Sequence, residues 1–287
     1  MKASQLLLSL LLAPLIAHAA TTINATNADA YGADVGWVNW RGDVTSGAVV
    51  GEYFCSGFIY SANCGWINLG SGGPANGIRY QNDSATNFGV NMMSDGALRG
   101  FAYGANIGWI NFEALGNPRV DFKTGRFTGF AYGANVGWIN LGDALGHPVT
   151  DSITPGADGD RDGIADAWEL ERAGNLTKLG ATTDYDGDGL SDLAEYLADS
   201  NPFDSTDLLR ITMFDPHGNG TLVSLTWTSQ LSRCYFIEYR NDLVAGTWLD
   251  SGLGAIPPDG LTTARGFAGP GATRRFYRIR AIRPLAP

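Results

Sequence analysis

The sequence predicts a mainly β protein with three parts, and three observations support this. A Gly-Trp motif recurs four times in the first half of the chain. Two acidic segments with regularly spaced aspartates follow it. After residue 208, short segments alternate between apolar and polar residues, as strands with one buried face do. We therefore expect a domain of repeated β-hairpins over 20–150, a short loop-and-helix spacer over 151–207 and a β-sandwich over 208–287.

Composition and the N-terminus indicate an exported protein. The 287 residues carry a net charge of −10, with 39 glycines and 8 tryptophans but only 3 cysteines and 3 histidines. This leaves too few ligands for a zinc cluster, and the negative charge argues against a nucleic-acid partner. The apolar run 6–16, followed by Ala17-His18-Ala19, is typical of a signal peptide. We expect residues 1–19 to be removed and the mature chain to be secreted or held at the cell surface, without a transmembrane span.

The internal repeat predicts four hairpins. Its copies are Tyr31–Asn39, Tyr60–Asn68, Tyr103–Asn111 and Tyr132–Asn140. In the fourth copy we expect a strand over Phe127–Tyr132, a turn over 133–135 and a second strand over Val136–Leu141. The Asn or Asp of each turn suits a positive φ. One hairpin cannot bury its own apolar surface, so the copies must stack on one another or close into a barrel or prism.

The repeated tryptophans can face either the core or the solvent. We favour the core, because each repeat needs one and Trp buries a large area. If they face outward, they form a ladder of aromatic rings of the kind that stacks on sugar rings, and they become candidate ligand-binding residues. These residues are Trp37, Trp66, Trp109 and Trp138.

The cysteines lie in two different parts of the chain. Cys55 and Cys64 are nine residues apart on the two arms of the second predicted hairpin. In an oxidising compartment we expect them to form a local disulfide. Cys234 is left over, and we expect it to be buried and unpaired in the last domain.

The spacer carries the strongest chemical signal. Residues 151–207 include 15 acidic and 3 basic residues, and such dense negative charge needs a cation. Two twelve-residue loops have carboxylates at positions 1, 3, 5, 9 and 12, a glycine at position 6 and a carbonyl ligand at position 7. Hard oxygen ligands in this number favour Ca²⁺ over Mg²⁺ or a transition metal. The expected ligands are Asp158, Asp160, Asp162, Ile164, Asp166, Glu169, Asp184, Asp186, Asp188, Leu190, Asp192 and Glu195.

Short helices are expected after each loop, over Asp166–Ala173 and Asp192–Ala198. The C-terminal part shows a different pattern, of strand-like segments separated by turn residues. These segments are Leu209–Met213, Val223–Trp227, Cys234–Tyr239, Thr247-Trp248 and Arg275–Ala281. Five arginines at its end, between residues 274 and 283, are expected to point outward from an edge strand into solvent. An anionic polysaccharide or the acidic spacer are alternative partners for them.

Three resemblances accompany these patterns. The repeat resembles the A-x-x-x-N-x-G-W-I-N repeats of exported bacterial proteins, which imply no particular activity. The acidic loops, with the closing segment Asp199–Asp204, resemble bacterial thrombospondin type 3 repeats and dockerin-like modules more than full EF-hands, because neither is preceded by a helical pattern. A dockerin-like role in binding a cohesin partner is less favoured, since the contact residues are not duplicated. The C-terminal segments resemble fibronectin type III-like modules.

Together these features predict a binding protein rather than an enzyme. The sequence shows no nucleophile elbow, no His-Glu-x-x-His helix and no phosphate-binding glycine loop. The first hypothesis is a calcium-binding protein of the cell surface or extracellular space that acts in adhesion or scaffolding through its repeat domain. The alternatives are a carbohydrate-binding module that presents the four tryptophans, and a self-assembling matrix protein. The expected partners are polysaccharides, other cell-surface components or further copies of the chain.

Overall fold

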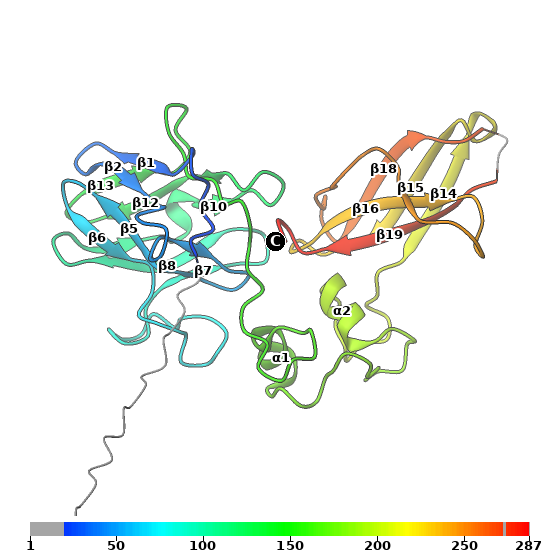
Figure 1. Ribbon diagram of the computed structural model, residues 1–287, viewed down its shortest axis with the longest axis horizontal. Coiled ribbons are helices and arrows are strands. Elements are labelled where there is room, and N and C mark those ends of the chain that lie inside the picture. Colours follow the sequence, from blue (N-terminus) through cyan, green and yellow to red (C-terminus); the bar gives the residue numbers. More distant parts are fainter. Residues whose placement is uncertain (1–19, 272–273, 287) are drawn as a thin grey trace, which may run out of the picture.

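The computed structural model describes residues 20–271 and 274–286, so the predicted signal peptide lies outside the described residues. The described chain is mainly β, as predicted. A barrel and a sandwich lie at opposite ends, and two short helices lie beside each other next to both (Figure 1). No helix in the described ranges is both long enough and apolar enough to cross a membrane.

The four predicted hairpins close into an eight-stranded antiparallel barrel. The strands follow the order β6-β5-β2-β1-β13-β12-β9-β8, and pairing of β6 with β8 completes the ring. Of the three arrangements left open by the sequence, the barrel is therefore the one observed. Its strands are β1 (Asp29–Gly32), β2 (Gly36–Asn39), β5 (Phe58–Ser61), β6 (Gly65–Asn68), β8 (Leu98–Gly104), β9 (Gly108–Asn111), β12 (Phe130–Gly133) and β13 (Gly137–Asn140).

Aliphatic side chains fill the barrel, and the tryptophans lie outside it. In every hairpin the residue after Trp is buried opposite a second buried residue; the pairs are Ala30–Val38, Ile59–Ile67, Ala102–Ile110 and Ala131–Ile139. The four repeated tryptophans are 44–48% exposed, so our prediction that they form the core is wrong. A ring of eight short strands leaves an interior just wide enough for side chains of aliphatic size. Four indole rings do not fit there.

Each hairpin turns through three residues followed by a glycine. In the fourth hairpin, Gly133 pairs with Gly137, whose φ is +65°. The positive φ therefore belongs to the glycine before Trp and not to Asn135, contrary to our prediction. This glycine forms a bulge, which places Val136 in the interior although strict alternation would put it outside with Trp138.

A ring of side-chain hydrogen bonds joins the four turns. The amide nitrogens of three turn asparagines donate to a carbonyl of the preceding turn: Asn63 to Val35 at 3.2 Å, Asn106 to Cys64 at 3.1 Å and Asn135 to Ile107 at 3.0 Å. Asp34 occupies the fourth position, next to Gly137. A carboxylate has no hydrogen to donate to a carbonyl, so this link of the ring is missing.

Smaller elements surround the barrel. β3 (Val49–Val50) pairs with β4 (Cys55–Ser56), β10 (Arg119–Val120) pairs with β11 (Phe127–Thr128), and β7 (Val90–Met92) extends the main sheet from β8. A 3-10 helix, η1 (Ala114–Gly116), follows β9. An isolated bridge joins Ile23 to Thr150, so the chain enters and leaves the barrel at the same place.

The predicted disulfide is wrong, because Cys55 and Cys64 are both free. Cys64 fills the inward position of the turn between β5 and β6, where the other hairpins carry an aliphatic residue, whereas Cys55 lies in β4 opposite Val50. Burial raises the pKa of the Cys55 thiol to about 12, so it is not ionised at neutral pH. Cys234 is free and buried, as expected.

The spacer has the two predicted helices with the predicted bounds, α1 (Asp166–Ala173) and α2 (Asp192–Ala198). Trp168 of α1 and Tyr196 of α2 pack edge to face with ring centroids 5.5 Å apart. Tyr53 of the barrel domain belongs to the same apolar cluster. The spacer is therefore docked on the barrel and does not stand apart from it as a free rod.

The C-terminal part is a sandwich of two three-stranded sheets, ordered β14-β15-β18 and β17-β16-β19. Val223 and Leu225 of one sheet share a core with Tyr235 and Ile237 of the other. Glu238 accepts hydrogen bonds from two of the outward arginines, Arg278 and Arg280, both at 2.7 Å. The strands are β14 (Ile211–His217), β15 (Leu222–Thr228), β16 (Cys234–Arg240), β17 (Leu249–Asp250), β18 (Thr262–Ala268) and β19 (Phe276–Ile282), with a 3-10 helix η2 (Gly218–Gly220). The sequence did not predict β18.

Candidate metal centre and aromatic surface

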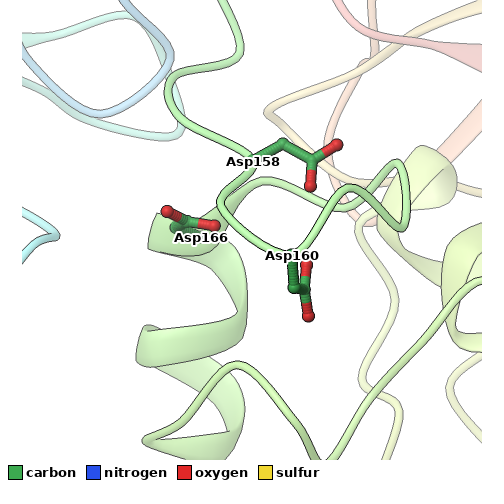
Figure 2. A group of neighbouring side chains, drawn as sticks. All are labelled: Asp158, Asp160 and Asp166. Atoms are coloured by element: carbon green, nitrogen blue, oxygen red, sulfur yellow. The ribbon is translucent and has the colours of Figure 1, made fainter.

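The first acidic loop brings five carboxylates together in two overlapping groups. Single oxygens of Asp158, Asp160 and Asp166 lie within 4.8 Å of one another, as do those of Asp160, Asp162 and Glu169. Figure 2 shows the loop carrying Asp158 and Asp160 around to Asp166, the first residue of α1. Because Asp160 belongs to both groups, the two groups form one cluster.

Backbone hydrogen bonds hold this loop in its curved shape. The amide of Gly163 donates to Asp158 Oδ2 at 3.1 Å, and the amide of Ile164 donates to Asp162 Oδ1 at 2.8 Å. Gly163 has a φ of +94°, a conformation that a side chain at this position would strain. These contacts curve the loop around its carboxylates.

The second loop repeats these contacts. The amide of Gly189 donates to Asp184 Oδ2 at 3.0 Å, and the amide of Leu190 donates to Asp188 Oδ1 at 2.7 Å. Asp184, Asp186 and Asp188 each bring one oxygen within 4.8 Å of the others. Two predicted ligands stand outside this group. Asp192 accepts hydrogen bonds from Thr183 and from the amides of Gly180 and Tyr185, and Glu195 lies buried in the first turn of α2.

The two glutamates that end the loops are fully buried beside other carboxylates. Among the described residues, neither oxygen of Glu169 has a hydrogen-bond partner, and Glu195 has only a 3.3 Å contact from Ser200 Oγ, which leaves Oε2 unpaired. Burial, and then neighbouring carboxylates such as Asp162, raise the pKa of Glu169 to about 7. Burial and Asp186 likewise raise the pKa of Glu195 to about 7. Buried carboxylates without partners are costly, and a cation at each loop would remove that cost.

The two loops pack against each other. The side chain of Leu193 in the second loop lies 3.5 Å from the place that a Cβ on Gly163 of the first loop would take, and it packs against the apolar cluster that includes Ile164. The spacer's ion pairs, Arg79–Glu171 and Arg172–Asp199, use carboxylates that belong to neither loop cluster. These arginines therefore do not neutralise the loop carboxylates.

A buried arginine of the sandwich connects α2 to the barrel. Arg233 is 1% exposed; its Nε donates to the carbonyl of Leu197 at 3.0 Å and its Nη2 to the carbonyl of Tyr196 at 2.7 Å. Its Nη1 donates to Oε1 of Glu52 in the barrel domain at 2.6 Å. The Arg233 side chain thus connects the sandwich, to which it belongs, with the spacer and the barrel. Its partner Tyr196 directly follows Glu195 in the chain.

Asp199, which ends α2, makes a second connection. Its Oδ1 accepts from Trp168 Nε1 at 3.0 Å and from Arg172 Nη2 at 3.1 Å, both on α1, and its Oδ2 accepts from Ser232 Oγ in the sandwich. Burial alone would raise the pKa of Asp199, but the nearby guanidinium and hydroxyl groups lower it. The sequence analysis missed this junction, because Glu52 and Arg233 are 181 residues apart and show no local pattern.

The tryptophans form a second candidate surface, which we name the aromatic belt. On the outer wall of the barrel, a Tyr and a Trp face each other in every hairpin, with ring centroids 4.9–5.0 Å apart. Its members are Tyr31, Trp37, Tyr60, Trp66, Tyr103, Trp109, Tyr132 and Trp138, all of them exposed. The belt gives the alternative arrangement that the sequence analysis described for outward-facing tryptophans.

The chain matches no protein-family model, no curated protein and no solved structure.

Proposed function

We propose that the chain is a calcium-binding modular protein, in which two ions fix the barrel domain against the sandwich for adhesion or extracellular scaffolding. The observation that carries this proposal is Glu169, fully buried among aspartates with both oxygens unpaired. Every side chain in the two clusters supplies oxygen, and this ligand set suits Ca²⁺. The first ion would be held by Asp158, Asp160, Asp162, Asp166, Glu169 and the Ile164 carbonyl; the second by Asp184, Asp186, Asp188, Asp192, Glu195 and the Leu190 carbonyl.

The role we propose for calcium is mechanical. Calcium binding would bring Glu195 to the ion and so fix the first turn of α2. Further along the same helix, the carbonyls of Tyr196 and Leu197 accept hydrogen bonds from Arg233. Since Arg233 also bonds Glu52, an ordered α2 keeps the barrel and the sandwich in one arrangement. Calcium binding is then coupled to folding of the spacer, as in other small metal-dependent units.

Calcium titration by calorimetry, combined with thermal unfolding, tests this proposal. We expect two sites with Kd on the order of 10⁻⁴–10⁻³ M, the range of extracellular modules, and a higher Tm with calcium. Glu169→Gln and Glu195→Gln should each weaken binding at one loop. Glu171→Gln is the matched control, because Glu171 also lies on α1 but pairs with Arg79 outside the cluster. Unchanged calcium-dependent melting in both loop variants would contradict the proposal.

The aromatic belt supports a second candidate function, carbohydrate binding by the exported or surface-attached protein. A half-exposed indole offers a flat apolar face with a polar tip, and such rings are common in recognition surfaces. Binding, rather than catalysis, is the activity we propose in either case. Self-assembly into a matrix is the remaining alternative, and calcium-dependent growth of particles in light scattering, without ligand binding, would favour it.

A further inference from the structure

One of the four tryptophans has surroundings that the other three lack. The tryptophans of successive repeats are 29 residues apart, except that Trp66 and Trp109 are 43 apart. Part of this longer connection, residues 82–88, lies against Trp109. The ring of Phe88 meets the indole of Trp109 edge to face, with centroids 4.9 Å apart. Phe101 also packs on Trp109, at 6.2 Å, but the second and fourth hairpins have an equivalent Phe at 6.3 and 6.1 Å, so Phe88 is the particular neighbour. The longer connection therefore gives the tryptophan of the third hairpin an aromatic neighbour, Phe88, from outside the repeat.

The other three tryptophans are covered differently. Each has a glycine of the neighbouring loop against the edge of its benzene ring, so close that an added Cβ would meet ring carbons within about 3 Å; the pairs are Gly146–Trp37, Gly42–Trp66 and Gly116–Trp138. Each of these tryptophans therefore packs against the loop that leaves a neighbouring hairpin. Trp109 has Phe88 in place of the glycine, although its exposure is the same as theirs.

A cavity of about 390 Å³ lies between the inserted loop and Trp109. Its apolar walls are the three rings of Phe88, Phe101 and Trp109. Its polar side consists of the neighbouring residues Asn82, Asp83 and Ser84, with Ala85 beside them. Small-molecule sites have this size and this mixture of apolar wall and few polar groups.

Hydrogen bonds within the loop hold the polar side of the cavity in place. The amide of Asn82 donates to the carbonyl of Asn87 at 2.9 Å, and Asn82 Oδ1 accepts from the amide of Gly89 at 3.0 Å. Asn87, itself buried, donates from Nδ2 to Asp83 Oδ1 at 3.3 Å. These bonds fix the rim, and a fixed rim lowers the entropy lost when a ligand binds.

We propose that this cavity is a binding site for a neutral saccharide, with Trp109 as its aromatic platform. The flat indole can pack on the C–H face of a sugar ring. The Asp83 carboxylate can accept hydrogen bonds from the sugar hydroxyls, and the Ser84 hydroxyl can donate or accept them. The lining has one carboxylate and no cationic side chain, so it is complementary to an uncharged ligand rather than to an anionic polymer. The inference rests on the carbohydrate-binding function proposed above and is independent of calcium.

Affinity electrophoresis of the mature chain tests the site. The probes are gels containing a β-1,4-glucan, a mannan or a galactan, with polygalacturonate as the anionic comparison and a proline-rich peptide as a non-sugar one. We expect retardation in at least one neutral gel and little in polygalacturonate. Trp109→Ala should weaken the binding at least tenfold, and Asp83→Ala, in an exposed loop where folding is not at risk, by three- to tenfold. Trp138→Ala, at the equivalent position of the fourth repeat, should change it less than twofold.

Four results would overturn the site. They are no retardation by any neutral polysaccharide, stronger retardation by polygalacturonate or by the peptide, equal losses in Trp109→Ala and Trp138→Ala, and unchanged binding in Asp83→Ala. Running every gel with calcium and with chelator, beside a melting curve, separates this inference from the proposed calcium function. If the protein is retarded by a neutral polysaccharide but its Tm is the same with calcium and with chelator, only the calcium proposal is contradicted. Absent retardation in a protein that calcium stabilises would overturn the saccharide site alone.

Discussion

The barrel and the spacer are stabilised in opposite ways. The barrel encloses a cluster of aliphatic and aromatic residues, and its turns satisfy one another through Asn side chains. The spacer buries Trp168 and Tyr196 together with two glutamates that have few partners or none. The closed sheet is therefore complete from its own residues, whereas in our proposal bound ions complete the interior of the short spacer. The predictions below test this difference.

Removing calcium should have the largest effect on stability, and it should affect the spacer and not the barrel. At a calcium concentration of one hundred times Kd, each site contributes about 2.7 kcal/mol, so two sites contribute roughly 5 kcal/mol. We expect scanning calorimetry in chelator to show an early transition of the spacer and an unchanged later transition of the barrel. Equal shifts of both transitions would show that the two parts do not differ in this way.

Breaking the junction should come next. Arg233→Met leaves Glu52 and two α2 carbonyls without their donor, and loss of one partner of a buried ion pair costs about 3–5 kcal/mol. The control is Arg265→Met, which breaks the more exposed pair with Asp259 and should cost below about 1 kcal/mol. Denaturant unfolding measures both. Similar costs for the two variants would contradict a special role for Arg233.

Acidity should act on the ion-free spacer in a particular direction. The pKa of Glu169 and that of Glu195 are raised from 4.5 to about 7, so the folded form without calcium binds more protons than the unfolded form between these values. Its stability is therefore full below about pH 4.5 and is lost as the pH rises through 7. In chelator we expect a higher Tm at pH 5 than at pH 8.

Calcium affinity should show the reverse dependence on pH. The same protons must leave before the ion binds, so affinity should fall between pH 8 and pH 6, by up to about tenfold per pH unit for each carboxyl group that titrates. The pKa of Asp199 is lowered from its ordinary value of 3.8, so its contribution to stability is fully present above that value and changes with pH only below it, outside this window. For the ion-free protein, a Tm in chelator that increases from pH 5 to pH 8 would contradict the raised pKa values of Glu169 and Glu195.

The smallest effect should come from completing the ring of turns. Asp34→Asn supplies the missing donor next to Gly137, and one added hydrogen bond contributes about 0.5–1.5 kcal/mol. We expect the barrel transition to move up by a few degrees. Asn135→Asp, which removes the equivalent bond to Ile107, should lower it by a similar amount. A lower Tm in Asp34→Asn would show that the ring does not contribute to stability.

The sequence predicted the local features well and the long-range ones poorly. Both helices and all four hairpins follow from patterns within a few residues, such as the spacing that ends each loop with Glu169 or Glu195. The outward direction of Trp138 depends on the barrel being closed, which fixes how much volume its interior offers. The free state of Cys64 depends on its buried position in the turn between β5 and β6. Neither property can be inferred from the residues adjacent to Trp138 or Cys64 in the sequence.

Contacts between distant residues carry most of what remained hidden. Arg233 has no neighbour in sequence that explains its burial, and its partner Glu52 belongs to another part of the chain. The site at Trp109 had a weak signal in the longer spacing before the third repeat, because an insertion between otherwise equal repeats often carries a specific role. Strand β18 was missed because its glycine and its small residues weaken the alternation that marks a strand.

Closure also sets how many repeats the protein can have. An array of open repeats can gain or lose a unit during evolution and become only longer or shorter, since each unit touches its neighbours alone. In this barrel the first hairpin pairs with the last, through β1 and β13. A ring of three or of five hairpins would have a different radius, and the aliphatic side chains that fill the interior of four would then crowd or leave a void. Duplication can have built the ring, but once it closed, the number four became part of the fold.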